Sequence, residues 1–183
     1  MPRRADLDVI VEDPRWGAAG LDALAERAAE AVLARLGLAG PAEIALLATS
    51  DAKVARLNAD FRGKPAPTNV LSWPAAALAP PAPGAAPPLP RADAAGSLAL
   101  GDVALAYETC VREARAAGKP LDAHVTHLVV HGVLHLLGYD HISDADAALM
   151  ERLETEILLT LGQPDPHVTH GEGQAEFSGD ASR

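Results

Sequence analysis

The chain has 183 residues, which is long enough for one domain with its own hydrophobic core. Apolar residues make up 49% of the sequence and charged residues 22%, the balance of an ordinary globular protein. The net charge of −10 argues against a surface covered by nucleic acid, and a single cysteine, Cys110, excludes an internal disulfide. The sequence begins without a secretory signal, and no run approaches the roughly 18 apolar residues of a membrane helix, so we expect a cytoplasmic protein without a membrane partner.

Periodicity and capping residues predict the elements of the N-terminal part. They are a strand at 6–12, a helix at 22–36 ended by Gly37, a strand at 43–48, and a short helix that follows Thr49, Ser50 and Asp51 and ends near Asn58. A basic segment at 62–69 comes next, and its glycine and two prolines predict a loop rather than regular structure. This loop leads to a short strand closed by Pro74. Taken alone, it is more typical of a plain connection than of a substrate contact.

Residues 74–96 contain seven prolines and ten alanines with almost no charge, which predicts a flexible insertion without a catalytic duty. The alternating apolar pattern of a strand resumes at 97–105, and a helix is expected at 107–117. The C-terminal residues have the composition of a disordered tail. We therefore expect one domain over residues 1–163 and a tail over residues 164–183.

The next predicted helix begins at Asp122, which can cap it, ends at Gly138 and carries four histidines. At about 100° per residue, the four imidazoles fall on one stripe, and apolar residues cover nearly all the remaining circumference. These histidines are His124, His127, His131 and His135. Such a helix is expected to be buried, with its polar stripe lining a cleft.

Three histidines at this end of the chain predict a metal site. Side chains four apart on a helix have Cβ atoms about 5–6 Å apart, so His131 and His135 can bind one ion at about 2.0–2.1 Å. Three successive histidines of the stripe cannot bind the same ion, because residues 127 and 135 are about 12 Å apart along the helix axis. A left-handed turn at Gly138 would instead bring back His141. Three imidazoles with an open fourth position are typical of a catalytic zinc site.

The other polar residues near this motif are expected to play smaller parts. We expect His124 and His127 to be core or supporting residues, and His167 and His170 to be solvated in the tail. Asp140 could orient an imidazole through its second nitrogen, while Tyr139 could pack in the core or offer its hydroxyl group.

Gly132 stands where the helix of zinc proteases has its general base, a glutamate directly after the first histidine. The glycine removes that proton acceptor and is expected to open space beside the metal. A peptidase is therefore disfavoured.

Residues 143–146, Ser-Asp-Ala-Asp, resemble a capping box that opens the last helix. Its inward residues are expected to be Met150, Leu153, Ile157 and Leu161, and its outward residues Glu151, Glu154 and Glu156.

The segment from His131 to His141, HGVLHLLGYDH, resembles the signature of the YbeY family of bacterial ribosomal RNA maturation factors, which are regarded as metal-dependent endoribonucleases. Residues 62–74 and residues 100–102 are similar to two further blocks of that family. The resemblance covers roughly residues 6–163. It implies an α+β domain in which helices pack a small mixed, mostly parallel sheet around a central metal-binding helix.

The resemblance also implies a function and one further site residue, Arg62. The expected activity is cleavage of single-stranded ribosomal RNA in maturation and ribosome quality control, with the small subunit as partner and one zinc ion per chain. A guanidinium group opposite a metal can stabilise the charge that develops on a phosphodiester. Two alternatives stay open: a ribosome-assembly RNA-binding factor with a structural metal, and a metallohydrolase of other substrates. The oligomeric state is left open.

An RNA substrate has to be reconciled with the acidic net charge. We expect a confined basic groove lined by Arg62, Lys64 and Arg56. The three glutamates of the last helix are expected on the far side of the molecule.

Overall fold

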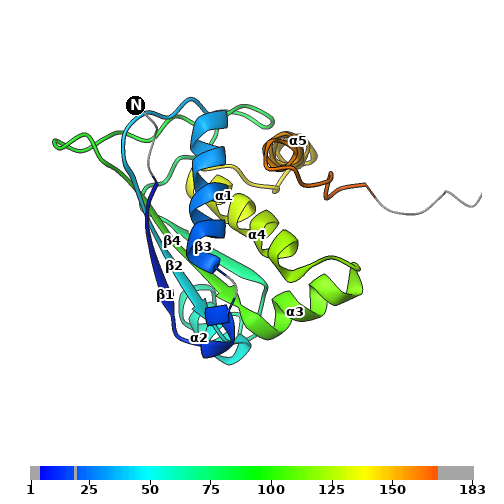
Figure 1. The fold of residues 1–183 in the computed structure, drawn as a ribbon. Coiled ribbons are helices and arrows are strands. Elements are labelled where there is room, and N and C mark those ends of the chain that lie inside the picture. Colours follow the sequence, from blue (N-terminus) through cyan, green and yellow to red (C-terminus); the bar gives the residue numbers. More distant parts are fainter. Residues whose placement is uncertain (1–4, 19, 169–183) are drawn as a thin grey trace, which may run out of the picture.

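The computed structural model describes residues 5–18 and 20–168 (Figure 1). Its elements are β1 (Ala5–Val11), a 3-10 helix (Pro14–Ala18), α1 (Leu21–Arg35), β2 (Ala42–Thr49), α2 (Asp51–Arg62), β3 (Val70–Pro74), β4 (Leu98–Ala106), α3 (Tyr107–Ala116), α4 (Leu121–Leu136) and α5 (Asp144–Thr160). Most of the predicted tail, including residues 169–183, lies outside the described residues. None of the helices within the described ranges is both long and apolar enough to cross a bilayer.

The four strands form one mixed sheet in the order β1-β2-β4-β3. β1 and β2 are parallel, as are β2 and β4, whereas β3 runs antiparallel to β4. Parallel neighbours need a crossover, and α1 and α2 lie in the connections that provide it. The predicted α+β domain with a small, mostly parallel sheet is confirmed.

Helices cover the two faces of the sheet unequally. α1 and α4 lie along one face, and α5 lies on their outer side (Figure 1). The smaller cluster on the other face joins α2 to β3 and β4 through Val54, Leu71 and Ala104. Leu46 belongs to the large cluster and Leu47 packs on the small one, because successive side chains of a strand point to opposite faces.

α4 is the central helix of the fold. It contacts α1, α3, α5, β3 and β4. Most of its apolar residues are buried, whereas the histidine stripe is partly exposed, as the sequence pattern predicted. Packing against these elements holds the stripe in one place relative to the rest of the molecule.

Helix α2 is longer than predicted. It continues past Asn58 to Arg62 and ends at Gly63, whose positive φ of 66° suits a glycine C-cap. Arg62 therefore lies on the last turn of a helix and not in the following loop, which corrects the sequence prediction. A helical backbone restricts the position of the Arg62 Cα atom, and so of its guanidinium group, more than a loop would.

The predicted caps are partly correct. Ser50 caps α2 by accepting a hydrogen bond from the Lys53 N–H, and Ser143 caps α5 by accepting one from the Asp146 N–H. Asp122 does not cap α4, which starts after Pro120 and has no side-chain cap. Proline suits this helix end because its missing N–H would have no intrahelical partner.

The Ala/Pro insertion between β3 and β4 packs on the end of α4. The Gly84 N–H donates to the Asp146 carboxylate over 2.8 Å, which ties the insertion to the start of α5. A Cβ atom placed on Gly138 would lie 2.1 Å from the Leu78 carbonyl oxygen. Nothing in the sequence indicated that this segment would border the histidine motif.

Candidate metal centre

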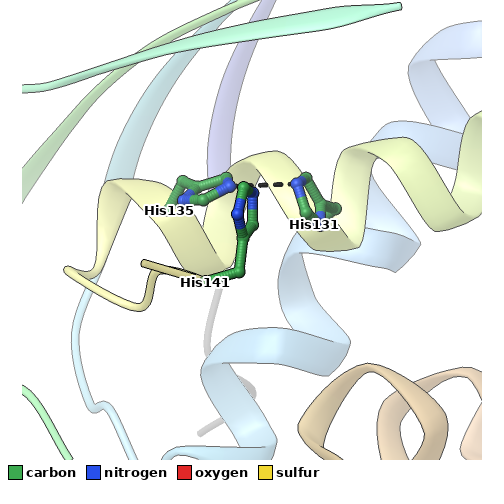
Figure 2. A group of neighbouring side chains, drawn as sticks. All are labelled: His131, His135 and His141. Carbon is green, nitrogen blue, oxygen red and sulfur yellow. Dashed lines mark hydrogen bonds between the residues drawn. The ribbon is translucent and has the colours of Figure 1, made fainter. Parts of the chain in front are cut away.

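Three imidazoles converge at the C-terminal end of α4. His131 and His135 lie one turn apart on the helix, and His141 comes from the segment that follows it (Figure 2). One ring nitrogen of each lies within 4.8 Å of the other two, and the Nε2 atoms of His131 and His135 are 2.9 Å apart. Helical spacing explains the first pair, and the turn at Gly138, with φ of 92°, explains the return of His141.

The second nitrogen of two rings is already a hydrogen-bond donor. His135 Nδ1 donates to the Tyr139 carbonyl over 2.8 Å, and His131 Nδ1 donates to the Glu154 carboxylate. A carbonyl or a carboxylate oxygen can only accept, so both Nδ1 atoms carry the proton. In a neutral ring, Nε2 is then a lone-pair acceptor.

When both rings are neutral, two lone pairs face each other across the 2.9 Å between the Nε2 atoms of His131 and His135. Burial lowers the pKa of His135 to about 4, so this ring is neutral at pH 7. A cation between the two nitrogens replaces repulsion by ligand bonds. Tetrahedral ligands at about 2.0–2.1 Å from an ion lie roughly 3.3 Å apart, close to the observed separation. The donor set fits a divalent metal.

Glu154 of α5 was predicted to lie on the outward face of its helix, and this prediction is wrong. Its side chain is 3% exposed and not on the outer face. Its carboxylate accepts hydrogen bonds from His131, from His127 Nε2 over 3.0 Å and from His167 Nε2 over 3.0 Å. Burial favours the neutral acid, but the hydrogen bonds from His127 and His131 outweigh it and hold the pKa of Glu154 below its usual value of 4.5.

The position of Glu154 could have been found from helical spacing. It lies four residues after Met150 and three before Ile157, both of which are buried. These intervals place all three on one face of α5. A carboxylate on an inward face needs polar partners, and the packing of α5 against α4 supplies them from the histidine stripe.

The remaining histidines bond to carboxylates. His124 Nε2 lies 2.8 Å from Glu113 Oε2 of α3, and His127 bonds to Glu154. Both contacts suit the supporting role that we expected. His167 is exposed, as predicted, but its ring also bonds to Glu154, which was not expected. His170 lies outside the described residues.

Asp140 does not orient an imidazole. Its carboxylate accepts from the backbone N–H of His141 over 2.8 Å. The ring of His135 is oriented instead by the backbone carbonyl of Tyr139. A main-chain acceptor cannot be predicted from side-chain types, because every residue has a backbone carbonyl.

The three imidazoles open into a cavity of about 600 Å³. Arg62 lies on its wall, and Arg62 Nη2 donates to the Ser72 carbonyl over 3.2 Å, which holds the guanidinium group there. The other lining residues are Thr68, Asn69, Val70, Ser72, Pro74, Ala76, Ala77, Leu78, Ala79, Gly138, Tyr139 and Asp140. Two segments distant in the sequence, 62–79 and 131–141, thus meet around the histidine group.

The expected basic groove is smaller than predicted. Of its three predicted members, only Arg62 lines this cavity. Arg56 borders another cavity, together with Lys53, Arg15 and acidic residues. The expectation that Glu154 lies on the far side from the metal site is also wrong, because it bonds to His131.

Gly132 faces the sheet and does not open space beside the metal, contrary to our expectation. A Cβ atom there would lie 3.2 Å from Ser72 Oγ and 3.2 Å from Val103 Cγ1. The Ser72 hydroxyl also donates to the Gly132 carbonyl over 3.3 Å. The glycine allows α4 to approach β3 and β4 closely, so that Ser72 can lie between the helix and the cavity.

Replacing Gly138 with alanine is expected to lower the free energy of unfolding by about 2–4 kcal/mol. The reasons are the positive φ and the overlap of a Cβ atom with the Leu78 carbonyl. Chemical denaturation measures this loss. The matched control is Gly37→Ala, where φ is also positive but no atom lies within 4 Å of the added Cβ. The control should lose only about 1–2 kcal/mol, and equal losses would contradict the proposed overlap.

Residues 12–162 match the family described as Endoribonuclease YbeY. The chain belongs to this family. The YbeY relative from Ruegeria pomeroyi is 58% identical over 162 residues, which cover 88% of this chain and 97% of that protein. The one from Dinoroseobacter shibae is 56% identical and covers 92% of this chain and 93% of its own length. The resemblance stated from the motif is confirmed.

A solved structure supports the fold alone. The solution structure of TM1509 from Thermotoga maritima superposes with a TM-score of 0.50 at 21% sequence identity. The match covers 89% of this chain and 99% of that one. At this identity, it adds nothing about the site.

Proposed function

We propose that this chain is a metal-dependent endoribonuclease that cleaves single-stranded ribosomal RNA during its maturation. The observation that carries the proposal is the convergence of ring nitrogens of His131, His135 and His141 in a cavity that Arg62 also lines. The YbeY relatives, which carry the name endoribonuclease, support the reaction class. The small ribosomal subunit as partner and a cytoplasmic location belong to the same proposal.

The metal ligands in this proposal are His131, His135 and His141. Three imidazole nitrogens suit zinc, and they leave a coordination position for substrate or water. When bound, the cation supplies Lewis-acid chemistry, which withdraws charge from a phosphoryl oxygen or makes a water molecule more acidic. The chain contributes the orientation of the rings: Tyr139 and Glu154 hold two of them by their Nδ1 protons.

Arg62 is proposed to bind the phosphate. Its guanidinium group presents several N–H donors in a plane and can contact two phosphate oxygens at once. One donor is used by the Ser72 carbonyl, which fixes the group at the cavity wall and leaves the others for substrate. Negative charge that develops on the phosphoryl oxygens is thereby stabilised most in the transition state.

Glu154 is a positioning residue in this scheme and not the general base. Both of its oxygens accept hydrogen bonds from imidazoles, and the side chain is 3% exposed. A general base needs a free oxygen within reach of the attacking water. Glu154 instead accepts a hydrogen bond from the Nδ1–H of His131, which makes the Nε2 atom of that ring a better electron-pair donor to a cation.

The proposal is tested with Arg62→Glu. We expect the rate of RNA cleavage to fall by about 10²–10³-fold, because one fixed donor to the developing charge is replaced by a repelling carboxylate. Metal content should not change. Single-turnover cleavage of a structured RNA and elemental analysis of the same preparation give the two quantities.

The matched control is Arg56→Glu, which makes the same change of charge on the same helix but outside the cavity. It should retain most of the activity. Equal rates for wild type and Arg62→Glu would remove Arg62 from the site. RNA cleavage at the wild-type rate by metal-free protein would overturn the proposed function as a whole.

A further inference from the structure

A second cluster of metal-ligating side chains lies beside the first. It consists of His127 of α4, Glu154 of α5 and His167, which follows α5. One nitrogen or oxygen of each lies within 4.8 Å of the others. The Nε2 atoms of His127 and His167 each lie 3.0 Å from the same carboxylate oxygen, Glu154 Oε2. Two imidazoles thus converge on one oxygen.

The segment that carries His167 is fastened to α5. The Asp165 carboxylate accepts from the Thr155 hydroxyl over 3.1 Å and from the backbone N–H of His167 over 2.8 Å. These bonds fold the chain back against the helix that holds Glu154. The approach of His167 to the cluster is therefore set by specific contacts.

The charge of the cluster is incompletely balanced by the protein. Glu154 is almost fully buried, and its ionic partners among the described residues are the imidazoles of His127, His131 and His167. An imidazole is positive only when protonated, whereas no lysine or arginine of the described part pairs with this carboxylate. A buried carboxylate is stable when a cation or full hydrogen bonding compensates it.

The cluster also borders open space. A cavity of about 250 Å³ is lined by His127, Glu154 and His167, and it also reaches His131 and His141 of the first site. It has room for water molecules that would complete the coordination of an ion. Tetrahedral ligands of zinc lie roughly 3.3 Å apart, so the two 3.0 Å contacts need to open by only about 0.3 Å.

We propose that His127, Glu154 and His167 form a second site for a transition-metal dication of the zinc class. Two imidazoles and one carboxylate suit Zn²⁺, whereas Mg²⁺ and Ca²⁺ prefer oxygen ligands alone. On binding the ion, each Nε2 gives up the proton that it donates to Glu154, which moves to Nδ1 or to solvent. Glu154 is shared: its Oε2 binds the second ion, and its Oε1 accepts the Nδ1 proton of His131. The two sites are joined by one carboxylate.

The test is the number of zinc ions bound by the full-length chain. Protein freed of metal is dialysed against Zn²⁺, and bound zinc per chain is measured by elemental analysis. Wild type should bind two ions, His167→Ala one, His135→Ala one, and the double variant none. Val168→Ala, which changes the neighbouring exposed residue, should bind two.

Two results would overturn the proposal: one ion in both wild type and His167→Ala, or two ions in both. The His135→Ala variant distinguishes failure of the second site from failure of the three-histidine site, because it removes a ligand of the three-histidine site alone. Anomalous diffraction at the zinc edge of zinc-loaded crystals gives the location. A peak bonded to the Nε2 atoms of His127 and His167 supports the site, and its absence there contradicts it.

Discussion

Replacing His135 with alanine is expected to remove one metal ion per chain and to lower RNA cleavage by at least about 100-fold. The imidazole supplies an Nε2 lone pair 2.9 Å from that of His131, and its Nδ1 proton is held by a backbone carbonyl. Loss of this ring leaves two nitrogen ligands where three converge. Metal analysis and cleavage rates of the same preparation measure the effect.

His124→Ala is the matched control for this substitution. It removes an imidazole from the same stripe of α4, but His124 bonds to Glu113 and belongs to neither metal-ligating group. The control should keep its metal and most of its activity. If His135→Ala cleaves RNA at the wild-type rate without its ion, the three-histidine site has no part in the reaction.

Replacing Glu154 with glutamine is expected to weaken metal binding at the three-histidine site by about 10–100-fold and to reduce cleavage in proportion. An amide keeps the size of the side chain but loses the charge that accepts the Nδ1 proton of His131. It can also accept fewer of the three imidazole hydrogen bonds, so the free energy of unfolding should fall by about 1–3 kcal/mol. A zinc competition titration and chemical denaturation give the two values.

The control for this change is Glu151→Gln, an exposed position on the same helix. It changes the net charge by the same amount and borders the smaller cavity, but the ion pairs of the described histidines on this helix are made by Glu154. Metal affinity at the three-histidine site and stability should therefore be unchanged. A Glu154→Gln protein with wild-type zinc affinity would show that the carboxylate does not support His131.

Much of the fold followed from local signals. Alternation predicted the strands, and apolar periodicity with glycine ends predicted the helices to within a few residues, because both depend on neighbouring positions. The main error in length was α2, where the glycine and prolines of residues 62–69 suggested that the loop began earlier. Its last turn continues to Arg62, since Gly63 and not an earlier residue ends the helix.

The histidine group was also a local feature. His131 and His135 are four residues apart on one helix, and the turn at Gly138 returns His141 after six more. Spacing and a single glycine were enough to predict that these rings meet. The partners of their Nδ1 atoms were not predictable in this way, because a backbone carbonyl and a distant glutamate satisfy them.

The sequence by itself determined the strands, the helices, the family motif and the convergence of three imidazoles, since each depends on intervals of a few residues. Only the tertiary structure decided that Glu154 and His167 meet the stripe of α4 and that Arg62 faces the same cavity as His131. Those contacts depend on how α2, α4 and α5 pack, and packing is set by the whole core. No local period records which face of one helix will meet a residue on another.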